Sequence, residues 1–125
     1  MIGRFTPTEH QHQVKLFQWA KAQSGKYPEL KLMFAVPNAA KRNLNTAMYM
    51  KAEGLASGVP DMFLPCARGG CHGLFIELKR CKGLTVSKTQ KAYLDGLNMQ
   101  GYKAVVCYGF DEAKNVILGY LKQEN

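Results

Sequence analysis

The order of helix-like and strand-like segments limits the fold of this chain more than any other feature. Four segments carry the capping signals or the apolar periodicity of helices, and four short apolar segments are bounded by turn-forming residues. Helices are predicted over residues 7–24, 44–53, 88–100 and 112–122, and strands over 30–36, 62–64, 74–79 and 102–108. The two middle strands follow one another and predict a hairpin. We therefore expect an α/β fold in which helices flank a small mixed sheet.

The starts of three predicted helices carry specific capping patterns. Thr6 is expected to cap the first helix, with Glu9 closing a capping box. Ser87 and Gln90 have the same spacing at the third helix. Asp111 is expected to cap the last helix. These patterns predict where the helices begin, and they also give Glu9 and Gln90 a structural explanation that competes with any role in chemistry.

Length and charge narrow the class of protein. The chain has 125 residues, which predicts a single domain over residues 1–125. It carries 17 Lys and Arg against 9 Asp and Glu, and a net charge of +8 points to a polyanionic partner such as nucleic acid. Solubility alone is the alternative, and the charge by itself does not decide between them. The longest apolar runs have five or six residues, so no membrane-spanning helix is expected. The first residues hold no apolar segment of a secretory signal, so a cytoplasmic location is expected.

The four cysteines, Cys66, Cys71, Cys81 and Cys107, are expected to be reduced thiols. Without a secretory signal, disulfides are not favoured. A zinc cluster is the alternative, but the spacings contain no pair of cysteines separated by two residues, which is typical of zinc sites.

The strongest chemical signal lies in the strand predicted over residues 74–79. Side chains alternate between the two faces of a strand, so Glu77 and Lys79 share one face, about 7 Å apart, while Ile76 and Leu78 share the other. Asp61 stands at the start of the preceding strand, and pairing of the two strands would bring it to Glu77. Two carboxylates held together suit Mg²⁺, and Lys79 could neutralise developing charge beside them. The alternative is a weak ion pair on a solvated face.

Together these residues match the P-D…E-x-K signature of restriction-endonuclease-like nucleases. Over residues 8–121 the sequence resembles a narrower family, the virus-type replication-repair nuclease (VRR-NUC) domain, whose small stand-alone members come mostly from phages and prophages. The resemblance is carried by residues 8–13 (TEHQHQ), 58–61 (GVPD), 75–79 (FIELK), 87–90 (SKTQ) and 101–102 (GY). It implies an αβββαβ core and a Mg²⁺- or Mn²⁺-dependent DNA endonuclease that forms a homodimer. It also implies branched substrates such as Holliday junctions, in a bacterial or phage-infected cell.

The resemblance also implies roles for five residues. Asp61 and Glu77 fall on metal-binding positions, as does Glu9, the acid of the first helix. Lys79 falls on the catalytic lysine, and Gln90 on a later glutamine near the acids. Capping alone could explain Glu9 and Gln90, although Glu9 lies one helical turn before the inward-facing stripe of its helix.

Basic residues near this motif are candidates for DNA contacts. Arg80, Lys82, Lys88 and Lys91 follow Glu77 closely and could hold phosphates without reading sequence. Lys41 and Arg42 lie in a basic connection that could equally be a solvated loop. A catalytically silent DNA-binding module on the same fold would explain the charge equally well. It would not explain Asp61, Glu77 and Lys79 together, because acids beside a phosphate repel it unless a metal lies between them.

Overall fold

The computed structural model describes residues 6–37 and 43–125. Its α-helices are α1 (Glu9–Gln23), α2 (Leu44–Ala52), α3 (Lys88–Met99) and α4 (Phe110–Leu121), and a 3-10 helix, η1, spans Pro28–Leu32. Its strands are β1 (Phe34–Ala35), β2 (Met62–Leu64), β3 (Leu74–Lys79) and β4 (Lys103–Tyr108). None of the helices in these two ranges is long and apolar enough to cross a membrane.

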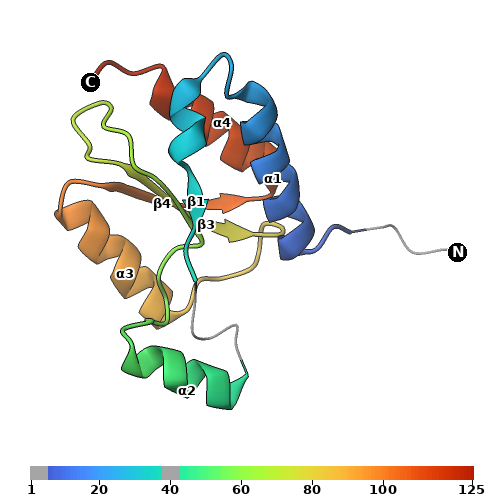
Figure 1. Ribbon diagram of the computed structural model, residues 1–125, viewed down its shortest axis with the longest axis vertical. Coiled ribbons are helices and arrows are strands. Elements are labelled where there is room, and N and C mark those ends of the chain that lie inside the picture. Colours follow the sequence, from blue (N-terminus) through green and yellow to red (C-terminus); the bar gives the residue numbers. More distant parts are fainter. Residues whose placement is uncertain (1–5, 38–42) are drawn as a thin grey trace, which may run out of the picture.

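The strands form one mixed sheet in the order β1-β2-β3-β4. Strands β1, β2 and β3 pair antiparallel, and β3 pairs parallel with β4. Helices α1 and α4 pack together on one face of the sheet, and α3 packs against β4 on the other (Figure 1). The predicted α/β class, the hairpin and the αβββαβ core are confirmed, with α2 inserted between β1 and β2 and α4 added at the end.

Strand β3 separates the apolar core from the polar residues of interest. Leu74, Ile76 and Leu78 are at most 1% exposed and join the core built with α1 and α4. Because neighbouring side chains of a strand point to opposite faces, Glu77 and Lys79 lie on the side of the sheet that faces α3. The alternation predicted for this strand is therefore correct.

The strand predicted over residues 30–36 is mostly wrong. Pro28 stands in the first turn of η1, which carries the chain to Leu32, and only Phe34 and Ala35 form a strand. The short β1 matches its partner, because β2 has only three residues and pairs with β1 at two positions. The backbone N–H of Val36 donates to the carbonyl of Asp61 at 2.8 Å, which extends this contact by one hydrogen bond.

Two predicted helix starts also need correction. Thr8, not Thr6, caps α1, and Gln11 closes the capping box, so Glu9 is the first helical residue and is not the capping partner. Helix α4 begins at Phe110, after Gly109 at φ 88°, so Asp111 lies in its first turn. By contrast, the Ser87–Gln90 box at α3 is confirmed.

Candidate metal centre

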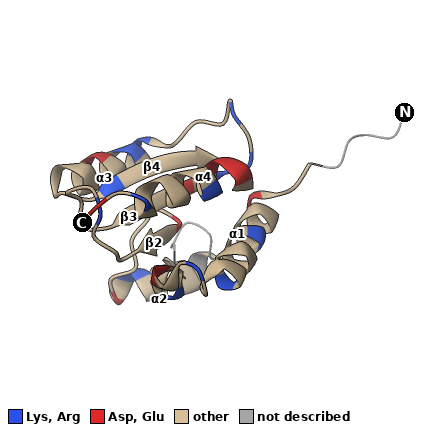
Figure 2. Cartoon of the chain, turned by 90° about the horizontal axis from the view of Figure 1, so that it is seen from above, with Lys and Arg blue, Asp and Glu red and all other residues tan. Residues whose placement is uncertain are grey.

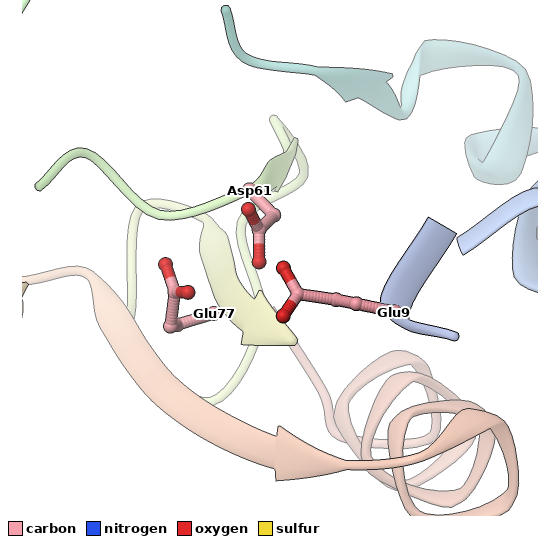
Figure 3. A group of neighbouring side chains, drawn as sticks. All are labelled: Glu9, Asp61 and Glu77. Atoms are coloured by element: carbon pink, nitrogen blue, oxygen red, sulfur yellow. The ribbon is translucent and has the colours of Figure 1, made fainter. Parts of the chain in front are cut away.

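Three carboxylates from separate parts of the chain meet at one end of the sheet. Glu9 comes from the first residue of α1, Asp61 from the residue before β2, and Glu77 from β3. Each offers an oxygen atom, and these oxygens all lie within 4.8 Å of one another. Figure 3 shows the three side chains pointing toward a common space. The β2–β3 hairpin explains why Asp61 lies near Glu77. Met62 pairs with Ile76, and the same register brings Asp61 opposite Glu77.

Two of the three acids are removed from solvent. Asp61 is 3% exposed and Glu77 is 1% exposed, so the pair of Glu77 and Lys79 is not a weak ion pair on a solvated face. The Asp61 carboxylate accepts a 2.6 Å hydrogen bond from the backbone N–H of Leu78. Burying carboxylates is costly unless charges and hydrogen bonds compensate them. Fold stability alone therefore gives no reason to gather such groups.

Lys79 and Gln90 complete the polar surroundings of Glu77. The Lys79 ammonium lies 3.8 Å from Glu77 Oε2, and its side chain is 14% exposed. The Gln90 Nε2 group donates to the same Glu77 oxygen at 3.2 Å. Lys79 Nζ also donates to Gln90 Oε1 at 3.3 Å. The structure thus brings together all five residues for which the resemblance implied a role in the centre.

The donor set fits a divalent cation of the Mg²⁺ type. All three acids offer hard oxygen ligands, which Mg²⁺ prefers. When ionised, three carboxylates and one ammonium leave a formal charge that a single divalent ion balances. Oxygens bound to one Mg²⁺ lie about 3 Å apart when adjacent and about 4.2 Å apart when opposite, so the three carboxylates, whose oxygens lie within 4.8 Å of one another, would draw closer together around such an ion.

A groove of about 880 Å³ opens beside two of these acids. Glu9 and Asp61 line it together with Gln13 and Phe17 of α1 and Val36 after β1. Gln13 and Phe17 are half-buried along this groove. A polymer strand lying in it would pass beside Glu9 and Asp61.

The described basic residues that were predicted to contact DNA lie on the surface. Arg80, Lys82 and Lys88 are exposed, and Lys91 lies 3.3 Å from Asp95 on the surface of α3. Figure 2 shows Lys and Arg on several elements, α1 and α3 among them. Arg80 also borders a second hollow, of about 580 Å³, that Lys15 and His12 share. Lys41 and Arg42 lie outside the described residues.

The four cysteines are unpaired thiols. Cys66 and Cys107 are buried, and burial raises the pKa of Cys107 to about 12, so it stays protonated at neutral pH. Within residues 6–37 and 43–125, the acids Glu9, Asp61 and Glu77 are the one group arranged to hold a metal ion. A zinc cluster of cysteines is therefore not formed by the described part of the chain.

Two features of the centre were not predicted from the sequence. One is the backbone N–H of Leu78, which holds Asp61; main-chain groups leave no residue signature. The other is the double use of Gln90, which both caps α3 and contacts Glu77. The Ser87–Gln90 spacing predicted the cap, and the family resemblance placed Gln90 near the acids, but these were alternatives, and no pattern indicated that one amide serves both purposes.

Comparisons with known proteins agree with this geometry. The family model of the VRR-NUC domain matches residues 6–111. A solved structure described as a VRR_NUC domain protein superposes with a TM-score of 0.83 at 30% sequence identity, over 99% of this chain and 94% of the other. The comparison with curated proteins gave no match.

Proposed function

Because the chain belongs to the VRR-NUC family, which implies a nuclease, we propose that it is a Mg²⁺- or Mn²⁺-dependent endonuclease that hydrolyses phosphodiester bonds in DNA. The observation that carries this proposal is the meeting of Glu9, Asp61 and Glu77 within 4.8 Å, with the Lys79 ammonium beside Glu77. A divalent ion in such a site supplies activation of water and neutralisation of phosphate charge.

The residues of the centre and its surroundings have separate roles in the proposed reaction. Glu9, Asp61 and Glu77 would hold the ion, and the Leu78 N–H fixes the Asp61 carboxylate. Lys79, held between Glu77 and Gln90, orients the attacking water or stabilises the negative charge that develops on the phosphate. Gln90 keeps its amide against Glu77. Arg80, Lys82, Lys88 and Lys91 bind the DNA backbone without reading its sequence.

We further propose that the substrate is branched DNA, such as a Holliday junction, and that the chain works as a homodimer. The support is the number of active centres: the described residues of one chain form one acid cluster, whereas resolving a four-way junction needs two symmetric cuts. Two centres related by a twofold axis match that symmetry. Met48 and Tyr49 of α2, which are 62% and 75% exposed, offer apolar surface for such an assembly.

The test is incubation with supercoiled, linear and four-way-junction DNA, with Mg²⁺, with Mn²⁺ and with a chelator. We expect cleavage only when a divalent ion is present, and fastest on the junction. Binding to all three DNAs without cleavage under any condition would contradict the nuclease and favour a catalytically silent DNA-binding module. Equal cleavage of linear and junction DNA would contradict the selectivity alone.

A further inference from the structure

The first turn of α3 joins a helix cap to the candidate centre through one side chain. Ser87 Oγ accepts the backbone N–H of Gln90 at 3.1 Å, and the Ser87 N–H donates to Gln90 Oε1 at 2.9 Å. The same Oε1 accepts from Lys79 Nζ at 3.3 Å, and Gln90 Nε2 donates to Glu77 Oε2 at 3.2 Å. The Gln90 amide is therefore held on one side by the cap and on the other by the centre.

The cap decides which end of this amide faces Glu77. An amide offers an acceptor oxygen and a donor NH₂ group of nearly equal size. Both groups that face Oε1, the Ser87 N–H and the Lys79 ammonium, are donors. Turning the amide over would set its NH₂ group against two donors and its oxygen against the Glu77 carboxylate. The Ser87 N–H of the cap and the Lys79 ammonium therefore together keep the donor end directed at Glu77.

The cap of α1 provides an internal comparison. Thr8 and Gln11 form the same two hydrogen bonds there, at 3.1 and 2.8 Å. The α3 box differs because its glutamine also touches Lys79 and Glu77. A glutamine therefore closes the capping box of both α1 and α3, but only the glutamine of α3 also contacts residues of the centre.

We propose that Ser87 is a positioning residue of the centre: through the capping box it holds the Gln90 amide between Lys79 and Glu77. Ser87 does not touch the acids, so it acts through Gln90. The inference rests on the proposed function and adds to it the residue that sets the orientation of Gln90. Groups that orient metal-binding side chains typically change activity about 10–100-fold when removed.

The test is a set of substitutions assayed by kcat at saturating DNA and Mn²⁺. Ser87→Ala keeps the Ser87 N–H that donates to Gln90 Oε1 but removes the Oγ acceptor that ties Ser87 to the first turn of α3. Because Ser87 is then no longer fixed against Gln90, we expect kcat to fall about tenfold with little change in KM. Ser87→Thr keeps a hydroxyl and should restore kcat to within about twofold of the original protein. Ser87→Gly also lacks the hydroxyl but suits a cap position better than alanine, so it replaces Ser87→Ala if that variant does not fold.

A matched control separates positioning from loss of a cap. Asn43 caps α2 by accepting the N–H of Thr46 at 2.9 Å, and it takes no part in the acid cluster. Asn43→Ala removes a bond of the same kind and should leave kcat unchanged. In a Gln90→Ala background, Ser87→Ala should lower kcat no further, because the residue it acts through is gone.

The results that would overturn the role of Ser87 differ from those that would overturn the proposed nuclease function. The proposal is wrong if Ser87→Ala keeps the original kcat, or lowers it equally with and without Gln90. Cleavage by Glu77→Gln at the original rate would contradict the proposed function instead. If no cleavage occurs at all, the NMR signals of the Gln90 side-chain amide still decide. They should shift in Ser87→Ala and stay in place in Asn43→Ala, and unchanged signals in Ser87→Ala would overturn the proposal.

Discussion

Asp61 combines a structural bond with its place in the acid cluster, so two substitutions of this residue have different consequences. Asp61→Asn keeps an oxygen acceptor for the buried Leu78 N–H but loses the negative charge. Asp61→Ala leaves that N–H without its acceptor, which costs about 1–3 kcal/mol, partly offset by relief of repulsion from Glu77. We expect both variants to lose cleavage and Asp61→Ala to be the less stable in urea unfolding.

Each half of this expectation can fail separately. Cleavage by Asp61→Asn near the original rate would show that Asp61 has no role in the metal centre. Equal stability of the two variants would mean that the hydrogen bond to Leu78 contributes nothing to the fold.

Single residues also show how far the sequence could predict the centre. Asp61, Glu77 and Lys79 could be nominated because strand alternation and hairpin pairing bring them together by local rules. Glu9 could not be decided, because its role depends on the cap: with Thr8 rather than Thr6 at the cap, Glu9 is freed from the box. Thr6 with Glu9 and Thr8 with Gln11 both have the spacing of a capping box, so the local pattern alone does not choose between the two threonines.

At the level of elements, Gly58 sets the approach of the Asp61 segment to α3. Its φ is +85°, and a Cβ at this position would lie 2.7 Å from Thr89 Cγ2 and 2.9 Å from the Thr89 backbone. Only glycine both adopts this conformation easily and permits the contact. The segment that leads to Asp61 can therefore pass directly against the first turn of α3, which carries Gln90.

We expect Gly58→Ala to be strongly destabilising and to reduce cleavage, since it pushes α3 and Asp61 apart. Gly54→Ala is the matched control: its φ is +103°, but no atom lies within 4 Å of the added Cβ. It should show only the conformational cost, about 1–2 kcal/mol. Thermal unfolding and cleavage rates check the pair. Equal losses in both variants would show that the contact with Thr89 has no effect.

Elements with local signals were predicted well, and those fixed by distant contacts were not. The β2–β3 hairpin and the α3 cap follow from turn residues and capping spacing. The start of α4 does not, because the Phe110 N–H donates to Nδ1 of His12 at 3.0 Å, across most of the chain. Likewise, apolar residues near Leu30 resembled a strand, but Pro28 begins a 3-10 turn whose Leu30 fills the core.

For the whole molecule, the net charge of +8 predicts how DNA affinity depends on salt. If Arg80, Lys82, Lys88 and Lys91 each neutralise a phosphate, the slope of log K against log salt should be about −3.6 on duplex DNA. Fluorescence anisotropy between low and moderate salt would measure it in a cleavage-inactive variant. A slope near zero would exclude binding through the phosphate backbone.

The oligomeric state is a second property of the whole molecule that can be predicted. We expect a C₂ homodimer, because a single chain of this size offers one acid cluster in its described part and a junction needs two cuts. Light scattering at micromolar concentration should give twice the 14.0 kDa of one chain. A mass of one chain that persists with junction DNA present would contradict paired cutting and leave a monomer that nicks DNA.

The central claim is that the carboxylates of Glu9, Asp61 and Glu77 form the metal site of a nuclease. The most direct test compares the original protein with Glu77→Gln in single-turnover cleavage of one DNA substrate with Mn²⁺, after equal unfolding temperatures and equal DNA affinity have been established. Loss of several kcal/mol of metal-assisted stabilisation predicts cleavage slower by about a thousandfold or more. Cleavage by Glu77→Gln at the original rate, or cleavage by the original protein with chelator in place of Mn²⁺, would contradict the claim.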